Sequence, residues 1–454
     1  MKSLETFIKI EWLFIKVMWA GLLGKKSNAF GWAYKKWTTG HTFRLIGSHV
    51  QSDFWSVLRY AKRSLAVLHR SGGPIHTDAK SGLDKIGIYA QWSTQKKEYG
   101  EYVSQVLKRP IDVYYFRDEL AVEVPLMVRI IMLGHLLTWT CLLGLISIGS
   151  RRKGNWGLML MQWLENHSIA QQLKFQHCHK VYLFGGYEND SPFTGLCFKT
   201  MKIKMVMVPS PNPIRNFYQQ TIADGFVFTA DFQQVEYEKY QAEWWVEEFE
   251  SWPFPGFNKL STYFKNIENA NKGTNRLAFM SRGMWKRAEQ GLHSQNDNKD
   301  LDYEMNCMSA LKSFLQNRNE LELLICPHPI EKQTSEDWEK TKEYYQSFFG
   351  SLKLVFPESR SVNSYQLFEM AEVSVASVSS VNIERLFCGY KTLYAPIGAE
   401  VEFFGHSALD QVVARSETEL HLLLEKAFAC SDDEFFSSFQ LAAYHHRAFS
   451  DFLK

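Results

Sequence analysis

The sequence predicts an α/β protein made of two doubly wound halves, each a parallel sheet with helices on both faces. Short apolar runs recur along the chain after residue 82, as buried parallel strands require. Segments with helical periodicity separate these runs, which is typical of parallel sheets. A stretch at 250–275, which begins with Trp, Pro and Gly residues and continues with polar ones, divides the runs into two series.

The composition supports a folded chain of about two to three domains. With 45% hydrophobic and 22% charged residues, the protein can bury sizeable cores, which excludes a disordered tail. Aromatic residues make up 15%, a share that membrane interfaces and sugar-binding surfaces both favour. The seven cysteines are odd in number and form no C-x-x-C pair, so we expect a reduced, cytoplasmic protein.

The first segment, residues 1–82, is predicted to be helical and basic. Residues 1–80 hold 13 Lys or Arg and 4 Asp or Glu, which favours an anionic membrane surface as partner, and no nucleic-acid motif accompanies them. Residues 7–23 contain Lys9 and Glu11 and so lack the apolar core of a signal peptide. We expect an amphipathic helix that associates with membranes, and the alternative is a core-facing helix of a soluble domain.

A second apolar segment, residues 130–149, contains no Asp, Glu, Lys or Arg. Its length would allow a membrane span. A span would place the strand-like runs before and after it on opposite sides of a bilayer, although they are expected in one sheet. We therefore predict a monotopic helix or a deeply buried one, within a Rossmann-like domain at 83–255.

The expected elements follow in chain order. The strands of the first half are 85–91, 111–116, 181–184, 203–208 and 225–229. After a linker at 256–275, a second Rossmann-like domain at 276–430 has strands at 277–280, 321–326, 352–356, 373–376 and 392–395. Its helices are expected at 303–316, 337–349, 364–370 and 416–429, and a closing helix at 431–454. Ligands of such sheets bind outside the carboxyl ends of the strands.

Two motifs follow strands of the second half. His328 stands between Pro327 and Pro329 at the end of strand 321–326, where its ring can donate a hydrogen bond to a phosphate; the alternative is a surface histidine in a loop. The run Ser377-Val-Ser-Ser380 precedes a helix, so hydroxyls and free backbone N–H groups can form an anion site there. The alternative is plain capping by Ser379 or Ser380, and both can hold together.

These motifs resemble the donor domain of GT-B glycosyltransferases. The resemblance covers residues 320–400 and rests on His328-Pro329, Asn363-Ser364-Tyr365, Leu367, Ala371-Glu372-Val373, Ser379-Ser380, Glu384 and Gly389. It is strongest for bacterial capsule and surface-polysaccharide transferases that transfer Kdo, sialyl or glycerophosphate groups. The sequence departs from their pattern at Glu372, Asn382, Arg385 and Lys391-Thr392.

The resemblance implies that His328, Pro329, Ser379 and Ser380 hold the phosphates of a donor nucleotide and that Glu384 binds its ribose. It also implies that the first half binds the acceptor and supplies a general base. Candidate bases are Glu188 and Asp190, which follow strand 181–184, and Asp224; the alternative for each is a solvated loop or turn residue. Ser93 and Thr94, in the loop after the first strand, are candidates for binding acceptor or phosphate.

The sequence therefore predicts a metal-independent glycosyltransferase. Its partners would be a CMP-, CDP-, UDP- or GDP-linked sugar and a glycan or lipid-linked acceptor of surface polysaccharide synthesis, such as capsule or lipopolysaccharide. We expect it at the inner face of the cytoplasmic membrane, with no cofactor and no metal, because His177-Cys178-His179 lacks a second ligand pair. The alternatives are a non-hydrolysing nucleotide-sugar epimerase and an inactive scaffold that binds glycan or membrane.

Overall fold

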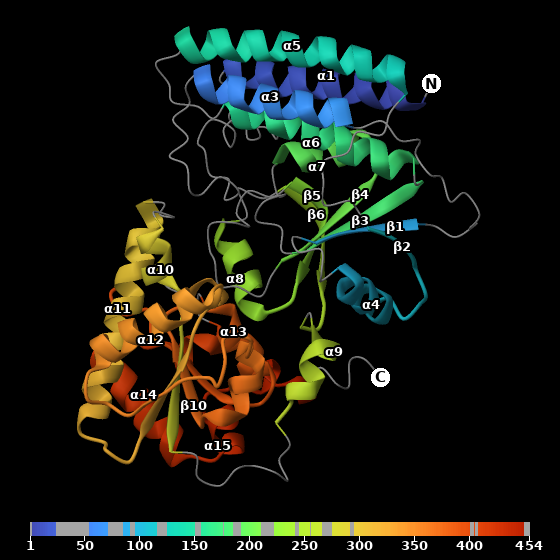
Figure 1. Cartoon of the computed structure of the whole chain (residues 1–454). Coiled ribbons are helices and arrows are strands. Elements are labelled where there is room, and N and C mark those ends of the chain that lie inside the picture. Colours follow the sequence, from blue (N-terminus) through green and yellow to red (C-terminus); the bar gives the residue numbers. More distant parts are fainter. Residues whose placement is uncertain are drawn as a thin grey trace. The chain divides into compact units, whose positions relative to one another are not determined.

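The computed structural model divides into two compact units (Figure 1). The first comprises Met1–Ser210, Asn216–Phe228 and Tyr240–Trp252, and the second comprises Pro211–Arg215, Thr229–Lys239 and Pro253–Lys454. The structure describes residues 2–23, 54–70, 85–90, 96–115, 125–149, 156–175, 177–184, 192–209, 222–240, 245–254, 256–265, 275–290, 295–399, 404 and 407–448. Each unit is an α/β body built on one parallel sheet, as the sequence predicts.

The sheet of the first unit has the strand order β2-β1-β3-β4-β5-β6, and all its pairs are parallel. Its strands are β1 (Lys85–Ala90), β2 (Asp112–Tyr115), β3 (Cys178–Phe184), β4 (Lys204–Val208), β5 (Ile222–Phe228) and β6 (Trp245–Ser251). The first five confirm the predicted strands. The edge strand β6 was not predicted, because three glutamates interrupt its apolar pattern and leave it half-exposed.

Helices cover this sheet in two layers on one side. On the sheet lie α6 (Trp156–Phe175), which contacts β3, and α7 (Pro192–Thr200), which contacts β4 and β5. Outside them lie α1 (Lys2–Leu22), α3 (Phe54–Arg70) and α5 (Leu126–Gly149), and each contacts α6 (Figure 1). A shorter helix, α4 (Lys96–Val106), packs against β1. The described helices of the basic segment, α1 and α3, therefore belong to the first unit.

The sheet of the second unit has the strand order β11-β10-β7-β8-β9 and is also fully parallel. Its strands, all predicted, are β7 (Arg276–Met280), β8 (Glu322–Cys326), β9 (Leu354–Val355), β10 (Val373–Ala376) and β11 (Lys391–Tyr394). The helices are α10 (Met284–Glu289), α11 (Gln295–Gln316), α12 (Ser335–Phe349), α13 (Ser380–Phe387), α14 (Glu417–Ala429) and α15 (Asp432–Ser438). The predicted helix at 364–370 is the 3-10 helix η7 (Ser364–Met370).

Part of the expected linker is built into the second unit. Helix α9 (Phe257–Leu260) and the 3-10 turn η4 (Ser261–Tyr263) are followed by Phe264, whose ring stacks on His446 with centroids 4.0 Å apart. Leu260 lies in the core of this unit. The predicted linker at 256–275 is therefore corrected over its first residues, because their apolar side chains pack on the second core.

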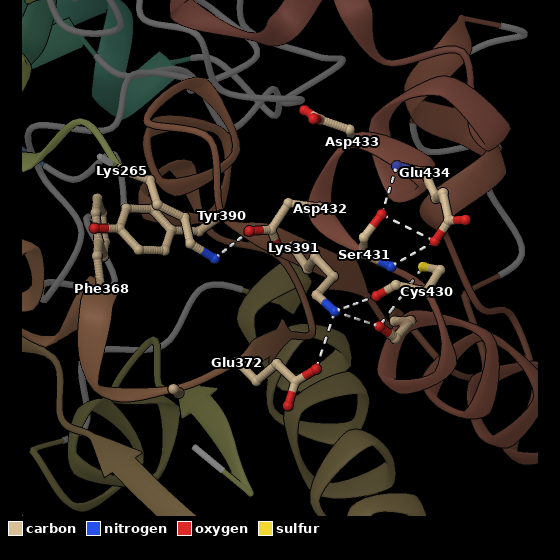
Figure 2. A network of polar contacts seen from close by, with 12 residues as sticks. Lys265, Phe368, Glu372, Tyr390, Lys391, Cys430, Ser431, Asp432, Asp433 and Glu434 are labelled. Atoms are coloured by element: carbon tan, nitrogen blue, oxygen red, sulfur yellow. Dashed lines mark hydrogen bonds and ion pairs between the residues drawn. The ribbon is translucent and has the colours of Figure 1, made fainter. Parts of the chain in front are cut away.

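Two departures from the transferase pattern lie at the amino edge of the second sheet, where they hold the C-terminal helices (Figure 2). Lys391, at the start of β11, is 3% exposed and donates from Nζ to Glu372 Oε1 at 3.0 Å. The same ammonium donates to the carbonyl oxygens of Ala427 and Cys430, each at 2.7 Å. Glu372 and Lys391 therefore stabilise the fold. They lie at the edge of the sheet opposite to the strand ends that bind ligands in such sheets.

Candidate functional site

The topology of the second sheet brings three loops together. The chain runs from β7 outward through β8 to β9 and then returns to β10 on the other side of β7, so the direction of winding changes between β7 and β10. Ligands of doubly wound sheets bind at such a switch point, outside the carboxyl ends of the strands. The loops that begin there are Ser281–Gly283 after β7, Pro327–Pro329 after β8 and Ser377–Ser379 after β10.

His328 is half-buried in the middle loop, where its ring caps the 3-10 turn η6 (Pro329–Lys332). Its Nδ1 accepts a hydrogen bond from the backbone N–H of Ile330 at 3.2 Å. Because Nδ1 accepts, the neutral ring carries its proton on Nε2, which is then a donor. Pro329, the first residue of η6, is exposed.

Three cations surround this histidine. Burial lowers the pKa of His328 to about 3, together with the positive charges of Arg287, Arg282 and Lys332. The ring therefore stays neutral at physiological pH. We call Arg282, Arg287 and Lys332 the cationic cluster. A phosphate beside it would gain from all three charges and from the N–H of the histidine ring.

Two buried carboxylates hold these loops from within the unit. Glu304, on α11, accepts from the backbone N–H groups of Arg282 at 2.7 Å and Met284 at 3.1 Å. Burial, reinforced by the charge of Glu331, raises the pKa of Glu304 to about 7. Glu331 is fully buried and accepts from the backbone N–H of His328 at 2.6 Å. The first two loops of the site are thus fixed by carboxylates that face away from solvent.

Gly283 allows the first two loops to approach each other. Its φ is +69°, and a Cβ there would lie 2.5 Å from Cγ2 of Ile330 and 3.2 Å from Cβ of His328. Both the left-handed backbone and the close contact require glycine. A side chain at this position would have to displace Ile330 and crowd His328.

The serine loop leaves its hydroxyls available. Ser377 is fully buried, and its Oγ has no hydrogen-bond partner among the described residues. Ser379 is the N-cap of α13, yet its side chain makes no capping hydrogen bond to the described backbone. Simple capping therefore does not account for Ser379. Its half-buried hydroxyl and that of Ser380 lie at the start of a helix, which favours an anion.

Glu384 lies one turn further along α13. Burial raises the pKa of its carboxyl to about 7, although a hydrogen bond from Tyr365 and the charge of Lys259 oppose this shift. The amino group of Lys259 is 5.3 Å from the centroid of the Tyr365 ring. A carboxyl held in this way can accept hydrogen bonds from a pair of hydroxyls once it is ionised.

The candidate residues of the first unit follow two neighbouring strands of its sheet. Strands β1 and β3 are neighbours that flank the switch point of this sheet, with Ala90 opposite Phe184. Ser93 and Thr94 follow β1, and Glu188 and Asp190 follow β3; all four lie outside the described residues.

Asp224 is not in the expected position before a strand. It lies inside β5, and its carboxylate accepts from the backbone N–H of Met205 on β4 at 2.7 Å. It lies four positions before Phe228, the carboxyl end of β5, or about 13 Å of extended chain. This contact gives Asp224 a role in the sheet, and we no longer assign it the role of a base.

Sequence reasoning missed several groups of the site. The cationic residues Arg282 and Arg287 and the supporting Glu304 were not singled out. The available signal was the Ser-Arg-Gly run directly after strand 277–280, because a cation and a glycine at a strand end are typical of phosphate loops. Within the described ranges, no group of three or more His, Cys, Asp or Glu is arranged to hold a metal ion.

Removing the Ser379 hydroxyl should weaken phosphate binding without lowering the stability of the fold. Ser379→Ala should leave the unfolding midpoint almost unchanged, because this side chain makes no cap. It should weaken phosphate binding by about 1–3 kcal/mol, the cost of a lost hydrogen bond to a charged group.

Ser416→Ala is the matched control, since Ser416 caps α14 by accepting from the N–H of Glu419 at 3.2 Å. It should lower stability by about 1 kcal/mol and leave binding unchanged. Calorimetry and urea unfolding would check both, and unchanged affinity in Ser379→Ala would contradict the assignment.

Among the known proteins compared with this chain, matches are found to solved structures. No family model matches the sequence, and no curated protein matches it. A UDP-GlcNAc 2-epimerase from Neisseria meningitidis bound to UDP-GlcNAc is 10% identical with a TM-score of 0.45, covering 82% of this chain and 99% of that one. A sucrose-phosphate synthase from Thermosynechococcus elongatus is 9% identical with a TM-score of 0.44, covering 82% and 96%. Likeness at this level carries no argument about activity.

Proposed function

We propose that this chain is a glycosyltransferase of the GT-B type that takes a sugar from a nucleotide-activated donor. The observation that supports it is the neutral His328 within the cationic cluster, at the same carboxyl edge of the second sheet as a serine loop with available hydroxyls. This combination of N–H donors, hydroxyls and cations suits a diphosphate. Glu384 would bind the ribose.

The roles follow from the charge that develops when the donor bond breaks. The leaving phosphate gains negative charge, which the Nε2–H of His328 and the cationic cluster would stabilise. A base in the first unit would take the proton of the acceptor hydroxyl. We keep Glu188 and Asp190 as candidates for that base, and Ser93 and Thr94 as candidates for acceptor binding. The acceptor we propose is a glycan or lipid-linked sugar of surface polysaccharide synthesis, on the cytoplasmic side of the membrane.

A panel of nucleotide sugars tests this proposal. UDP-, CDP-, GDP- and CMP-sugars are screened for thermal stabilisation, because a ligand at about 100 times its Kd adds about 2.7 kcal/mol to stability. The stabilising donor is then incubated with glycan and lipid-linked acceptors, and released nucleotide is measured. We expect acceptor-dependent release from one nucleotide class.

The same panel distinguishes the second candidate function. Because one solved structure to which the chain is similar is a UDP-GlcNAc 2-epimerase from Neisseria meningitidis, UDP-GlcNAc is also incubated alone and followed by NMR. Inversion at C2 without acceptor would favour an epimerase and contradict the transferase. Absence of stabilisation by every nucleotide sugar would contradict both enzymes and favour a scaffold.

A further inference from the structure

The described chain exposes its large hydrophobic side chains mainly on three helices of the first unit. All of those exposed among the described residues, except Leu422, lie on α1, α3 and α5 or directly after α1 at Leu23. These helices lie together as an outer layer, separated from the sheet by α6 (Figure 1). We call the exposed hydrophobic residues of α1, α3 and α5 the apolar face. Patches of this kind mark an interaction surface.

Helix α5 contributes the longest part of the apolar face. Exposed side chains recur every three or four residues from Leu126 to Ile148, and none of them is charged. Met127 is 72% exposed and Leu145 is 67% exposed. Leu126–Ile148 is long and apolar enough to cross a membrane, but only 22% of its most apolar window is buried. The core helix of a soluble protein would be mostly buried, so α5 requires another apolar neighbour.

A buried carboxylate fixes α5 to the rest of the unit. Glu11 of α1 is 5% exposed and accepts from His135 Nδ1 and Trp139 Nε1 of α5, each at 3.0 Å. It also accepts from Trp163 Nε1 and, at 3.2 Å, from His167 Nε2, both on α6. Burial raises the pKa of Glu11, but His167 and the two indole donors outweigh this effect and lower it. One ionised group thus joins three helices.

This attachment is incompatible with a span through a bilayer. The inner face of α5 is fully buried, with Met132, Leu136 and Leu143 at 0% exposure. Crossing a membrane would remove these residues from their core. It would also take two donors from Glu11, and a buried carboxylate without its partners costs several kcal/mol. Helix α5 therefore keeps one long side on the unit and presents the other side to its surroundings.

The exposed charges of α1 and α3 are positive except for Glu5 of α1, which pairs with Lys9 at 2.5 Å. Helix α3 contains no acidic residue and exposes Arg59, Lys62 and Arg63 among its apolar side chains. On α1, Lys16 is exposed, with its ammonium 5.7 Å from the centroid of the Trp12 ring. Each such cation near an anionic membrane surface contributes about 1 kcal/mol. Tryptophan beside lysine is typical of the level of the lipid headgroups.

We infer that the apolar face docks onto a bilayer that contains anionic lipids, with α5 lying in the plane of the membrane and not crossing it. The apolar side chains enter the outer acyl region, and the tryptophans and cations reach the headgroups. The occupant is a lipid surface, because exposed cations interspersed with apolar side chains complement anionic headgroups above an acyl layer. The inference does not rest on the proposed transferase, since vesicle binding needs no donor.

Flotation of the full chain with vesicles tests this inference. Vesicles of phosphatidylcholine alone and mixed with phosphatidylglycerol are compared without any nucleotide. We expect flotation with the anionic vesicles, weaker flotation with the neutral ones, and partial release at about 0.5 M salt, where charges are screened within a few Å. A chain that stays in the protein fraction with both vesicle types would overturn the inference.

Substitutions on the apolar face provide the matched comparison. Leu137→Glu with Leu145→Glu places two charges on exposed positions of α5 and should weaken flotation at least about tenfold. Leu422→Glu, at a position 61% exposed in the second unit, should float like the wild type. Equal flotation of all three proteins would contradict docking through this face. A dimer in solution that the double variant dissociates, with no flotation, would assign the face to a second copy and also contradict the inference.

Cys141 provides a probe in the unmodified protein. It is exposed on α5 between Leu137 and Leu145, whereas Cys430 is partly exposed in the second unit. Anionic vesicles should slow the reaction of Cys141 with a water-soluble maleimide and leave Cys430 unchanged. This measurement decides the question if the double variant fails to fold. Unaltered labelling of Cys141 on vesicles to which the chain binds would refute the proposed orientation.

Discussion

His328→Asn should reduce donor turnover by about 10²–10³-fold and leave the fold intact. Asparagine can keep the cap of η6, because its side-chain oxygen can accept the N–H of Ile330 that Nδ1 now accepts at 3.2 Å. It cannot reproduce the Nε2–H at the position of the phosphate. The loss should therefore appear in binding of the nucleotide and in turnover, and the unfolding midpoint should barely change.

The pH dependence of turnover tests whether the His328 ring is neutral. Because the pKa of His328 is lowered to about 3, the ring is neutral throughout the range from about pH 6 to pH 8. The ratio of wild-type to His328→Asn turnover should therefore stay constant over this range. His421→Asn is the control, since this partly buried histidine of α14 contacts the carbonyl of Ala310 at 3.0 Å. A ratio that changes near pH 6.5, or equal turnover by both variants, would refute a neutral donor at His328.

Arg385→Met should lower the free energy of unfolding of the second unit by about 3–5 kcal/mol. This fully buried residue of α13 donates to the carbonyl oxygens of Lys391, Phe368 and Ala371, and to Thr392 Oγ1 at 3.2 Å. Methionine fills part of the volume but leaves three buried carbonyl groups without this donor. Burial lowers the pKa of the guanidinium only to about 10, so it remains charged.

Urea unfolding measures this effect. Arg415→Met is the control, because Arg415 pairs with Asp410 at 2.5 Å with its side chain 40% exposed. An exposed pair contributes at most about 1 kcal/mol. A loss of less than 1 kcal/mol in Arg385→Met would show that water or rearrangement satisfies the carbonyls. The effect on nucleotide binding should be small, since Arg385 donates its hydrogen bonds to residues outside the three loops of the site.

The sequence predicted what depends on local pattern and missed what depends on packing between distant segments. The ten predicted strands are present because each is a short apolar run, whereas β6 carries glutamates and was missed. His328 and Ser379 could be singled out as candidates because they lie in the short loops that follow strands. Glu304 could not be found, because it lies in the middle of a helix and reaches the loop after β7 only through tertiary packing.

The same limit applies to Glu11. From the sequence alone, Glu11 shows only that residues 7–23 are not a signal peptide, since its carboxylate interrupts the apolar segment. Its burial depends on donors from residues more than one hundred positions away, such as His135 and His167. Periodicity shows which face of α1 is apolar, but not that this carboxylate is held by two other helices.

Hydrogen exchange with and without the stabilising nucleotide sugar tests the central claim most directly. We expect slower exchange in peptides that cover the three loops at 281–284, 327–331 and 377–383. Peptides at the amino edge of the same sheet, around Glu372 and Lys391, should exchange as before. Protection centred on that amino edge, or unchanged exchange in all three loops at a saturating concentration, would contradict a nucleotide site at the carboxyl edge of the second sheet.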